Sequence, residues 1–407
     1  MSPANFEQSA PVVQAESTSK FRFWGNVFLP LILLGLLIIV FLAIGPLGVF
    51  KAALPPIEEV SIQRIILQPN EITLKVVNDG PDPVTIAQVL VNESYWKFEM
   101  APSQTLPRLG RGTIKIYYPW LEGDTEKIKL ISRNGVTFDA EIPVATTSPS
   151  PNVQYLSSFA LLGVYVGVIP VFLGLLWLPS LRRLKEKWYS FFLALTVGLL
   201  VFLGIESLVE AIETTEKAPA VYQGLGVLML GFFIAVLILS AFSRQGSLAS
   251  QEKGESYRKL MLAYSVALGI GIHNLGEGLA IGGAYAVGEI SLGALLVLGF
   301  MIHNVTEGVA IVAPIAKAGV RLKQLVLMGL LAGVPTILGT WIGGFTYSPI
   351  WSVLFLAIGA GAIFQVVFSI TQYMAKPNWG SLFSFTNVWG FLLGLAVMYV
   401  TGFFVTV

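Results

Sequence analysis

The sequence contains no cysteine and only two histidines in 407 residues. The missing cysteines exclude disulfides, thiolate metal ligands and cysteine nucleophiles. Charge is scarce as well: Asp, Glu, Lys and Arg make up 12% of the chain, whereas hydrophobic residues make up 55% and the mean hydropathy is +0.74. A soluble domain with so little charge would be hard to keep in solution, so the composition predicts a polytopic α-helical membrane protein. The net charge of +1 gives no indication of a nucleic-acid partner.

The two histidines begin two copies of one motif. H-N-x-x-E-G runs from His273 to Gly278 and again from His303 to Gly308. Each copy lies within an apolar segment long enough to cross a bilayer, where an ionisable side chain costs roughly 2.5–3.5 kcal/mol at the centre of a helix. Because of that cost, ionisable residues inside a membrane are functional candidates by default.

Helical geometry brings the polar residues of each motif together. Residues four positions apart share a helix face, so His273 and Glu277 point the same way, and the second copy repeats the arrangement. The short loop around Gly288 makes the two helices antiparallel neighbours whose polar faces can meet. Nitrogen and oxygen donors suit Zn²⁺, Fe²⁺, Mn²⁺ or Co²⁺ without choosing among them. The motifs therefore predict a buried site for one or two divalent cations. Its expected ligands are His273, Asn274, Glu277, His303, Asn304 and Glu307.

Three further polar residues in apolar segments are weaker candidates. Glu206 and Glu210 are expected either to complete the metal site or to line its outer mouth, although an acidic pair at the membrane interface would give the same pattern. Gln365 can donate an oxygen ligand, but buried glutamines more often form hydrogen bonds between helices. Hydrogen bonding between helices is also the alternative role for the two His-Asn pairs. The repeat of the motif and its buried acids favour a metal site there.

The N-terminal part of the chain divides into four predicted segments. Residues 1–22 form a polar cytoplasmic tail, and the apolar residues 23–50 form an uncleaved transmembrane anchor. Residues 55–147 contain short alternating runs, such as Ile72–Val77, separated by turn sequences such as Arg133–Gly135, and predict a β-sandwich of about seven strands. This domain has no histidine, so we expect no catalytic site in it. Residues 148–154 form a linker rich in proline and serine.

Residues 155–407 contain eight further apolar segments. Lysine and arginine are concentrated in alternate loops, which by the positive-inside rule places the N-terminus in the cytoplasm and the β-domain and C-terminus outside. Pro170 and Pro335 interrupt the first and sixth segments, which correspond under a three-two-three division, as in transporters with inverted repeats. The segments span about 155–179, 188–212, 222–243, 260–287, 290–316, 322–346, 349–374 and 385–407.

The double motif resembles the fourth and fifth transmembrane helices of the ZIP (Zrt/Irt-like) divalent metal transporters, especially the prokaryotic branch with H-N-x-P-E-G in both. The resemblance covers about residues 155–407, including the eight-segment count and the outside C-terminus. It implies an eight-span bundle with a site formed by the fourth and fifth helices together with the second and seventh. It also implies uptake toward the cytoplasm by alternating access, commonly in a homodimer, across the plasma membrane. The metal, most simply Zn²⁺ but with iron, manganese or cadmium as further candidates, is then a substrate rather than a cofactor, and the protein is not an enzyme.

The chain departs from the family pattern in several places. The proline of each family motif is replaced by Gly276 and Thr306, and the loop after the third segment contains no histidine. The seventh segment has Ser369-Ile370 where the family often has an acidic or histidine pair. The anchored β-domain is not part of the family core.

Two other functions fit some of these features. The same ligands can serve an intramembrane metalloenzyme, a hydrolase or hydroxylase, in which the metal activates water or oxygen. The sequence has no H-E-x-x-H and no repeated E-x-x-H motif to support that chemistry. Alternatively, the β-domain is the functional part and the membrane region only anchors it, but eight segments with a buried double motif exceed what anchoring requires.

Overall fold

The computed structural model of the chain describes residues 20–44, 57–375 and 379–403. The chain divides into two units, residues 1–56 and 57–407. In the first unit a single helix, α1 (Lys20–Ile44), covers most of the predicted anchor, and its described side chains, Phe28–Val40, are apolar and largely exposed. Most of the predicted tail and the end of the predicted anchor, residues 45–50, lie outside the described residues.

The N-terminal part of the second unit is a β-sandwich. One sheet has the strand order β1-β2-β7-β5; the other has the order β4-β3-β8-β9, with β6 paired to β3. Nine strands are described where about seven were predicted, because β4, β5 and β6 span only two to four residues and are too short to give an alternating pattern. The strands are β1 (Val60–Gln68), β2 (Glu71–Asn78), β3 (Val84–Val91), β4 (Ser94–Trp96), β5 (Phe98–Ala101), β6 (Thr105–Leu106), β7 (Arg111–Ile116), β8 (Glu126–Ser132) and β9 (Thr137–Ile142).

Alternation of apolar and polar residues along the strands builds the core of the sandwich. In the register of β2 and β7, Ile72 lies opposite Ile116 and Leu74 opposite Ile114, and all four side chains are completely buried. They pack in one cluster with buried residues of the other sheet, including Leu130. The two sheets therefore share a single hydrophobic core, as predicted for a sandwich.

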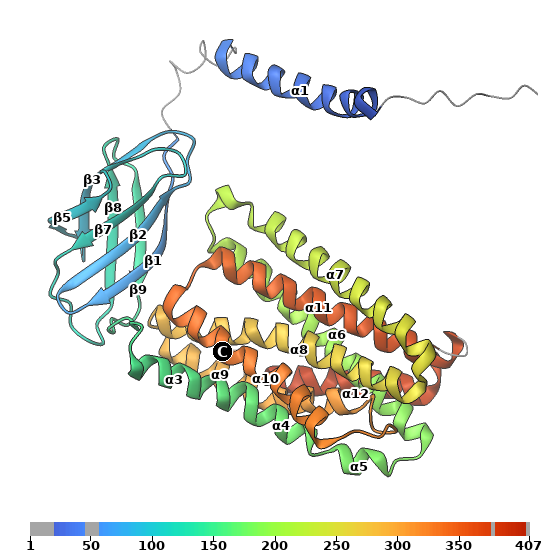
Figure 1. The fold of residues 1–407 in the computed structure, drawn as a ribbon. Coiled ribbons are helices and arrows are strands. Elements are labelled where there is room, and N and C mark those ends of the chain that lie inside the picture. Colours follow the sequence, from blue (N-terminus) through green and yellow to red (C-terminus); the bar gives the residue numbers. More distant parts are fainter. Residues whose placement is uncertain (1–19, 45–56, 376–378, 404–407) are drawn as a thin grey trace, which may run out of the picture. The chain divides into compact units, whose positions relative to one another are not determined.

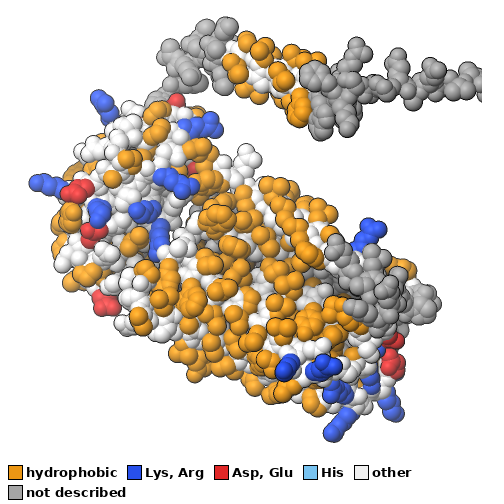
Figure 2. Space-filling model, in the orientation of Figure 1, with side chains coloured by type: hydrophobic (Ala, Val, Ile, Leu, Met, Phe, Trp, Pro, Cys, Tyr) orange, Lys and Arg blue, Asp and Glu red, His pale blue; other side chains and the backbone are white. Residues whose placement is uncertain are grey.

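The rest of the second unit is a helical bundle (Figure 1). The described part of the chain has seven helical segments long and apolar enough to cross a membrane, so the predicted class, a polytopic bundle with an N-terminal β-domain, is confirmed. Figure 2 shows hydrophobic side chains over the visible flank of this bundle. Its helices are α3 (Val153–Gly163), η1 (Val164–Val168), α4 (Ile169–Leu175), α5 (Leu178–Arg182), α6 (Glu186–Glu216), η2 (Ala220–Tyr222), α7 (Gly224–Lys253), α8 (Glu255–Ala286), α9 (Ile290–Val312), α10 (Leu322–Thr346), α11 (Pro349–Met374), η3 (Trp379–Phe383) and α12 (Phe385–Gly402).

Helix α8, the predicted fourth span, is not among those seven segments. It is long enough, but its polar motif and its many glycines lower its hydropathy. Most of its inner length is buried between α9, α10 and α11 rather than facing outward. A helix that carries a polar site needs protein around it instead of lipid, which explains why its composition departs from that of a peripheral helix.

Two pairs of helices in the bundle repeat the same contacts. The segment α3–η1–α4 packs on α9, and α10 packs on α8. In each pair two glycines cross so closely that an added Cβ would lie 2.2–2.3 Å from a backbone oxygen of the partner helix. Pro170 and Pro335 each lie one turn before the crossing glycine of their helix. This correspondence is what inverted repeats would produce. The crossing pairs are Gly174 with Gly308 and Gly339 with Gly278.

Candidate metal site

Four predicted ligands come together in the interior of the bundle. His273 and Glu277 project from α8, and His303 and Glu307 project from α9. All four side chains are buried, and each offers a ligand atom within 4.8 Å of the others. The spacing of four residues aligns each pair on one face, and the turn around Gly288 brings the two faces together.

Glu277 lies at the centre of this cluster. Its Oε1 atom lies 3.3 Å from Nε2 of His273 and is hydrogen bonded to Nε2 of His303. Its Oε2 atom accepts a hydrogen bond of 3.0 Å from Nδ2 of Asn304. One carboxylate thus contacts both imidazoles and one carboxamide, all of them buried.

Glu307 is surrounded differently. Both of its carboxylate oxygens are buried, and neither has a hydrogen-bond partner among the described residues. Asn274 lies beside it. A buried carboxylate without a partner is costly, and a cation bound at the cluster would provide the missing partner.

Ser207 of α6 orients one of the imidazoles, and the sequence analysis did not identify it. Its hydroxyl oxygen lies 2.8 Å from Nδ1 of His273. When this ring nitrogen carries the proton and donates it to Ser207, the lone pair of Nε2 faces the cluster and is free to bind a metal. A single buried serine in an apolar helix has no sequence signal that would distinguish it from other small residues.

The two predicted asparagine ligands hold neighbouring helices through their amide nitrogens. Nδ2 of Asn274 donates to the carbonyl oxygen of Ala332 at 3.2 Å, and Nδ2 of Asn304 donates to that of Val166 at 2.9 Å. Oδ1 of each is buried and has no partner among the described residues. Both oxygens are therefore left over for another interaction, such as a bond to a metal ion.

A large cavity leads to the cluster. Its volume is about 1070 Å³, and His273, Glu277 and His303 lie on its wall, whereas Glu307 does not. Glu206 and Glu210 of α6 line the same cavity. The cavity continues to β1 and β9 of the β-domain.

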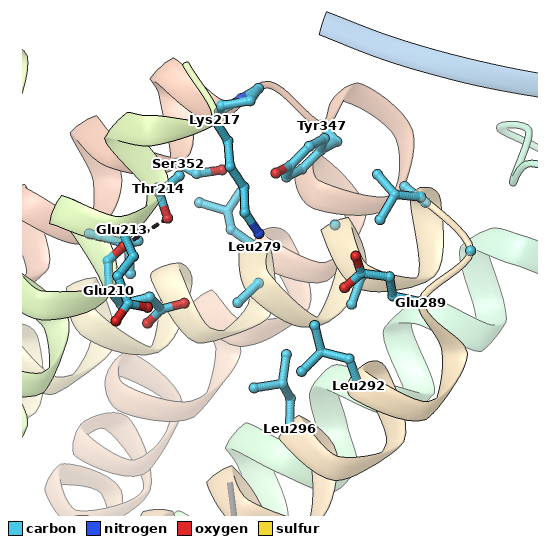
Figure 3. A pocket seen from close by; sticks show the side chains of 18 of the residues that line it. Glu210, Glu213, Thr214, Lys217, Leu279, Glu289, Leu292, Leu296, Tyr347 and Ser352 are labelled. Carbon is cyan, nitrogen blue, oxygen red and sulfur yellow. Dashed lines mark hydrogen bonds between the residues drawn. The ribbon is translucent and has the colours of Figure 1, made fainter. Parts of the chain in front are cut away.

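The charged side chains on the wall of the cavity are mainly acidic. Figure 3 shows Glu210 and Glu213 on one side, Glu289 on the other, and the side chain of Lys217 extending between them. The pKa of Tyr347, in the loop between α10 and α11, is raised by burial and further by the carboxylates of Glu289 and Glu210. Such a surface attracts cations into the cavity.

Gln365 lies elsewhere. It is buried in α11, its Nε2 atom donates to Oγ of Ser369 at 3.0 Å, and it lines a second cavity of about 290 Å³ between α7, α8, α10 and α11. The structure therefore does not bring Gln365 into the cluster of histidines and glutamates.

The β-domain contacts the bundle at the end where the large cavity opens. Arg64 donates a hydrogen bond to the carbonyl oxygen of Phe345 at the end of α10. Asp79 accepts one from the backbone N–H of Ala220 at 3.1 Å, and Arg111 donates one to the hydroxyl of Tyr222 at 2.9 Å. These contacts hold the sandwich against the loops that follow α6 and α10.

The family model of the ZIP zinc transporters matches residues 241–402, which include α8 and α9 with both motifs. No curated protein matches the chain. This family transports metal cations, and the buried cluster lies within the matched region. Over residues 241–402 the chain is therefore similar to the ZIP zinc transporters.

Proposed function

We propose that this protein carries Zn²⁺, and with lower preference other divalent cations, across the plasma membrane toward the cytoplasm by alternating access. The observation that carries the proposal is the buried cluster of His273, Glu277, His303 and Glu307 at the end of a cavity whose charged side chains are mainly acidic. Two ionised glutamates balance one dication, and two neutral imidazoles complete a nitrogen and oxygen donor set that zinc accepts. We include Asn274 and Asn304 as further ligands through their free Oδ1 atoms.

The cavities support an outward-facing state as one half of the cycle. The large cavity extends from the cluster toward the β-domain, whereas the cavity lined by Gln365 and Arg258 is separate from it. With the β-domain outside, as the loop charges favour, metal enters through the large cavity past Glu210 and Glu206. Alternating access then requires this cavity to close and a path on the opposite side to open.

We further propose that the protein is a homodimer in the membrane. The family resemblance motivates this proposal, and two helices offer apolar faces to a second copy or to lipid. In the span that contains α7 only 17% of the residues in its most apolar window are buried, and in that of α12 only 22%. Crosslinking of the protein in vesicles tests the dimer, and a single monomer band would contradict it.

Uptake of radiolabelled zinc into proteoliposomes tests the transport proposal. We expect flux through the wild type and its loss in His273→Ala and Glu307→Ala, because each variant removes a buried donor. Glu186→Ala, at the exposed start of α6, is the matched control and should leave the flux unchanged. Competition by iron, manganese and cadmium ranks the substrates.

The same experiment separates transport from the metalloenzyme alternative. Metal retained in stoichiometric amount by the wild type, lost from both variants and accompanied by no flux would contradict transport. It would favour an enzyme that uses the same ligands.

Uptake should also fall as the external pH is lowered. Imidazoles and carboxylates bind a metal only after losing their protons, so protons and metal compete for the cluster. Initial uptake rates at constant free zinc across an acidic pH series measure this competition. A flat profile would argue against metal binding by ionised glutamates.

A further inference from the structure

Pro170 interrupts the helix that packs against α9. A proline has no backbone N–H, so the carbonyl oxygen of Val166, one turn earlier, lacks its ordinary helical donor. The chain widens at this point into the π-helix η1, in which the N–H of Ile169 bonds to the carbonyl oxygen of Val164. The carbonyl of Val166 is thereby available to a side chain of another helix.

Asn304 of α9 uses this carbonyl. Its Nδ2 atom donates to the oxygen of Val166 at 2.9 Å and to Oε2 of Glu277 at 3.0 Å. A carboxamide nitrogen has two hydrogens, and these two bonds use both. The amide is therefore fixed between a defect in one helix and the central carboxylate of the metal cluster on another.

We propose that Pro170 is a positioning residue for the metal site: it frees the Val166 carbonyl, which orients Asn304, which in turn orients Glu277. This inference rests on the proposed metal site. It makes an interruption of the α3–η1–α4 segment part of the site, although Pro170 itself is not a ligand. Outer partners that orient a ligand commonly contribute 10–100-fold to metal affinity.

The second inverted pair of helices has a related bond whose acceptor is shifted by one residue relative to the proline. Nδ2 of Asn274 donates to the oxygen of Ala332 at 3.2 Å, within the turn that precedes Pro335 of α10. Each motif asparagine thus reaches the backbone of the proline-containing helix beside it. The two bonds differ in register: Val166 lies four residues before Pro170, whereas Ala332 lies three before Pro335, so only the Val166 carbonyl is the one that its proline leaves without a helical donor.

Pro170→Ala tests the proposal. Alanine supplies the missing N–H, which competes with Asn304 for the oxygen of Val166. Because alanine is a better helix former than proline, the variant should fold. We expect zinc to bind about 10-fold more weakly, by isothermal titration calorimetry of the purified full-length protein. Pro179→Ala is the matched control and should bind normally, since Pro179 lies in the first turn of α5, where the backbone N–H has no helical acceptor.

A double-mutant cycle shows whether Asn304 carries the effect. Asn304→Ala should weaken binding, and adding Pro170→Ala to it should produce no further loss, since the orienting bond is already gone. Unchanged affinity in Pro170→Ala, or losses that multiply in the double variant, would overturn the positioning role while leaving the metal site intact. A wild-type protein that binds no zinc would instead contradict the proposed function.

Discussion

At the scale of single residues, two glutamates with the same position in a repeated motif have different surroundings. Glu277 contacts both histidines and Asn304, whereas both oxygens of Glu307 are buried without a hydrogen-bond partner in the described part of the chain. The repeated motif predicts equivalence, because spacing on a helix is all that the sequence provides. The difference arises from the neighbouring helices, which the motif does not describe.

This asymmetry predicts different effects of neutralising the two acids. In the metal-free protein, Glu277→Gln should lower the thermal unfolding temperature more than Glu307→Gln, because among the described residues Glu277 has hydrogen-bond partners and the oxygens of Glu307 have none. Both variants should lose the stabilisation that zinc gives the wild type. Thermal unfolding with a chelator and with excess zinc measures both effects. Equal loss of metal-free stability would show that the two carboxylates are equivalent after all.

Ser207 gives a second prediction at this scale. Ser207→Ala removes the group that faces Nδ1 of His273 and should weaken zinc binding about 10-fold, because the imidazole is then free to turn its other nitrogen toward the cluster. Ser157→Ala is a suitable control, since the exposed Ser157 hydroxyl contacts only the backbone of its own helix. Calorimetric titration measures the zinc affinity of both variants. Equal affinities would show that Ser207 does not orient a zinc ligand.

At the scale of helices, close glycine crossings position the two motif helices. A Cβ added to Gly308 would lie 2.2 Å from the oxygen of Val171, so Gly308→Ala must push α9 away from α4. We expect a loss of about 1–3 kcal/mol in stability and a larger loss of uptake, because the motif of α9 moves with the helix. Gly402→Ala is the control, since a Cβ there meets nothing within 4 Å. A Gly308→Ala protein with normal uptake would show that the crossing distance does not matter for the site.

The helices also show which features a sequence can predict. The start and end of α10 and α11 match the predicted segments 322–346 and 349–374, because apolar runs bounded by polar turns define them clearly. The π-helix η1 was not predicted, since a widening by one residue depends on what the freed carbonyl meets on another helix. The clustering of His273, Glu277, His303 and Glu307 could be predicted from the spacing of the motifs. For Glu206 and Glu210 the sequence left two positions open, in the site or at its outer mouth, and the choice between them, like the position of Gln365, depends on how α6 and α11 rotate against α8.

At the scale of the whole second unit, the β-domain and the bundle share the large cavity. Strands β1 and β9 line its outer part, and Arg64 bonds to Phe345 across a very long stretch of sequence. Sequence patterns predicted both parts separately but gave no information on this contact, which depends on one guanidinium and one backbone carbonyl. We propose that the sandwich controls access to the cavity, since its strands β1 and β9 form part of the cavity wall.

The absence of cysteine allows a direct test of that control. Leu296→Cys places a single thiol in the cavity wall, and its rate of reaction with an external maleimide measures how open the cavity is (Figure 3). Adding Arg64→Ala and Arg111→Ala removes two of the bonds that hold the sandwich and should increase this rate severalfold. Ser103→Cys, exposed on the β-domain, should react equally fast in both backgrounds. The proposal is contradicted if the rate of maleimide reaction at position 296 does not change while zinc uptake stays normal. In that case the β-domain does not control access, and the acidic side chains of the bundle alone admit the metal.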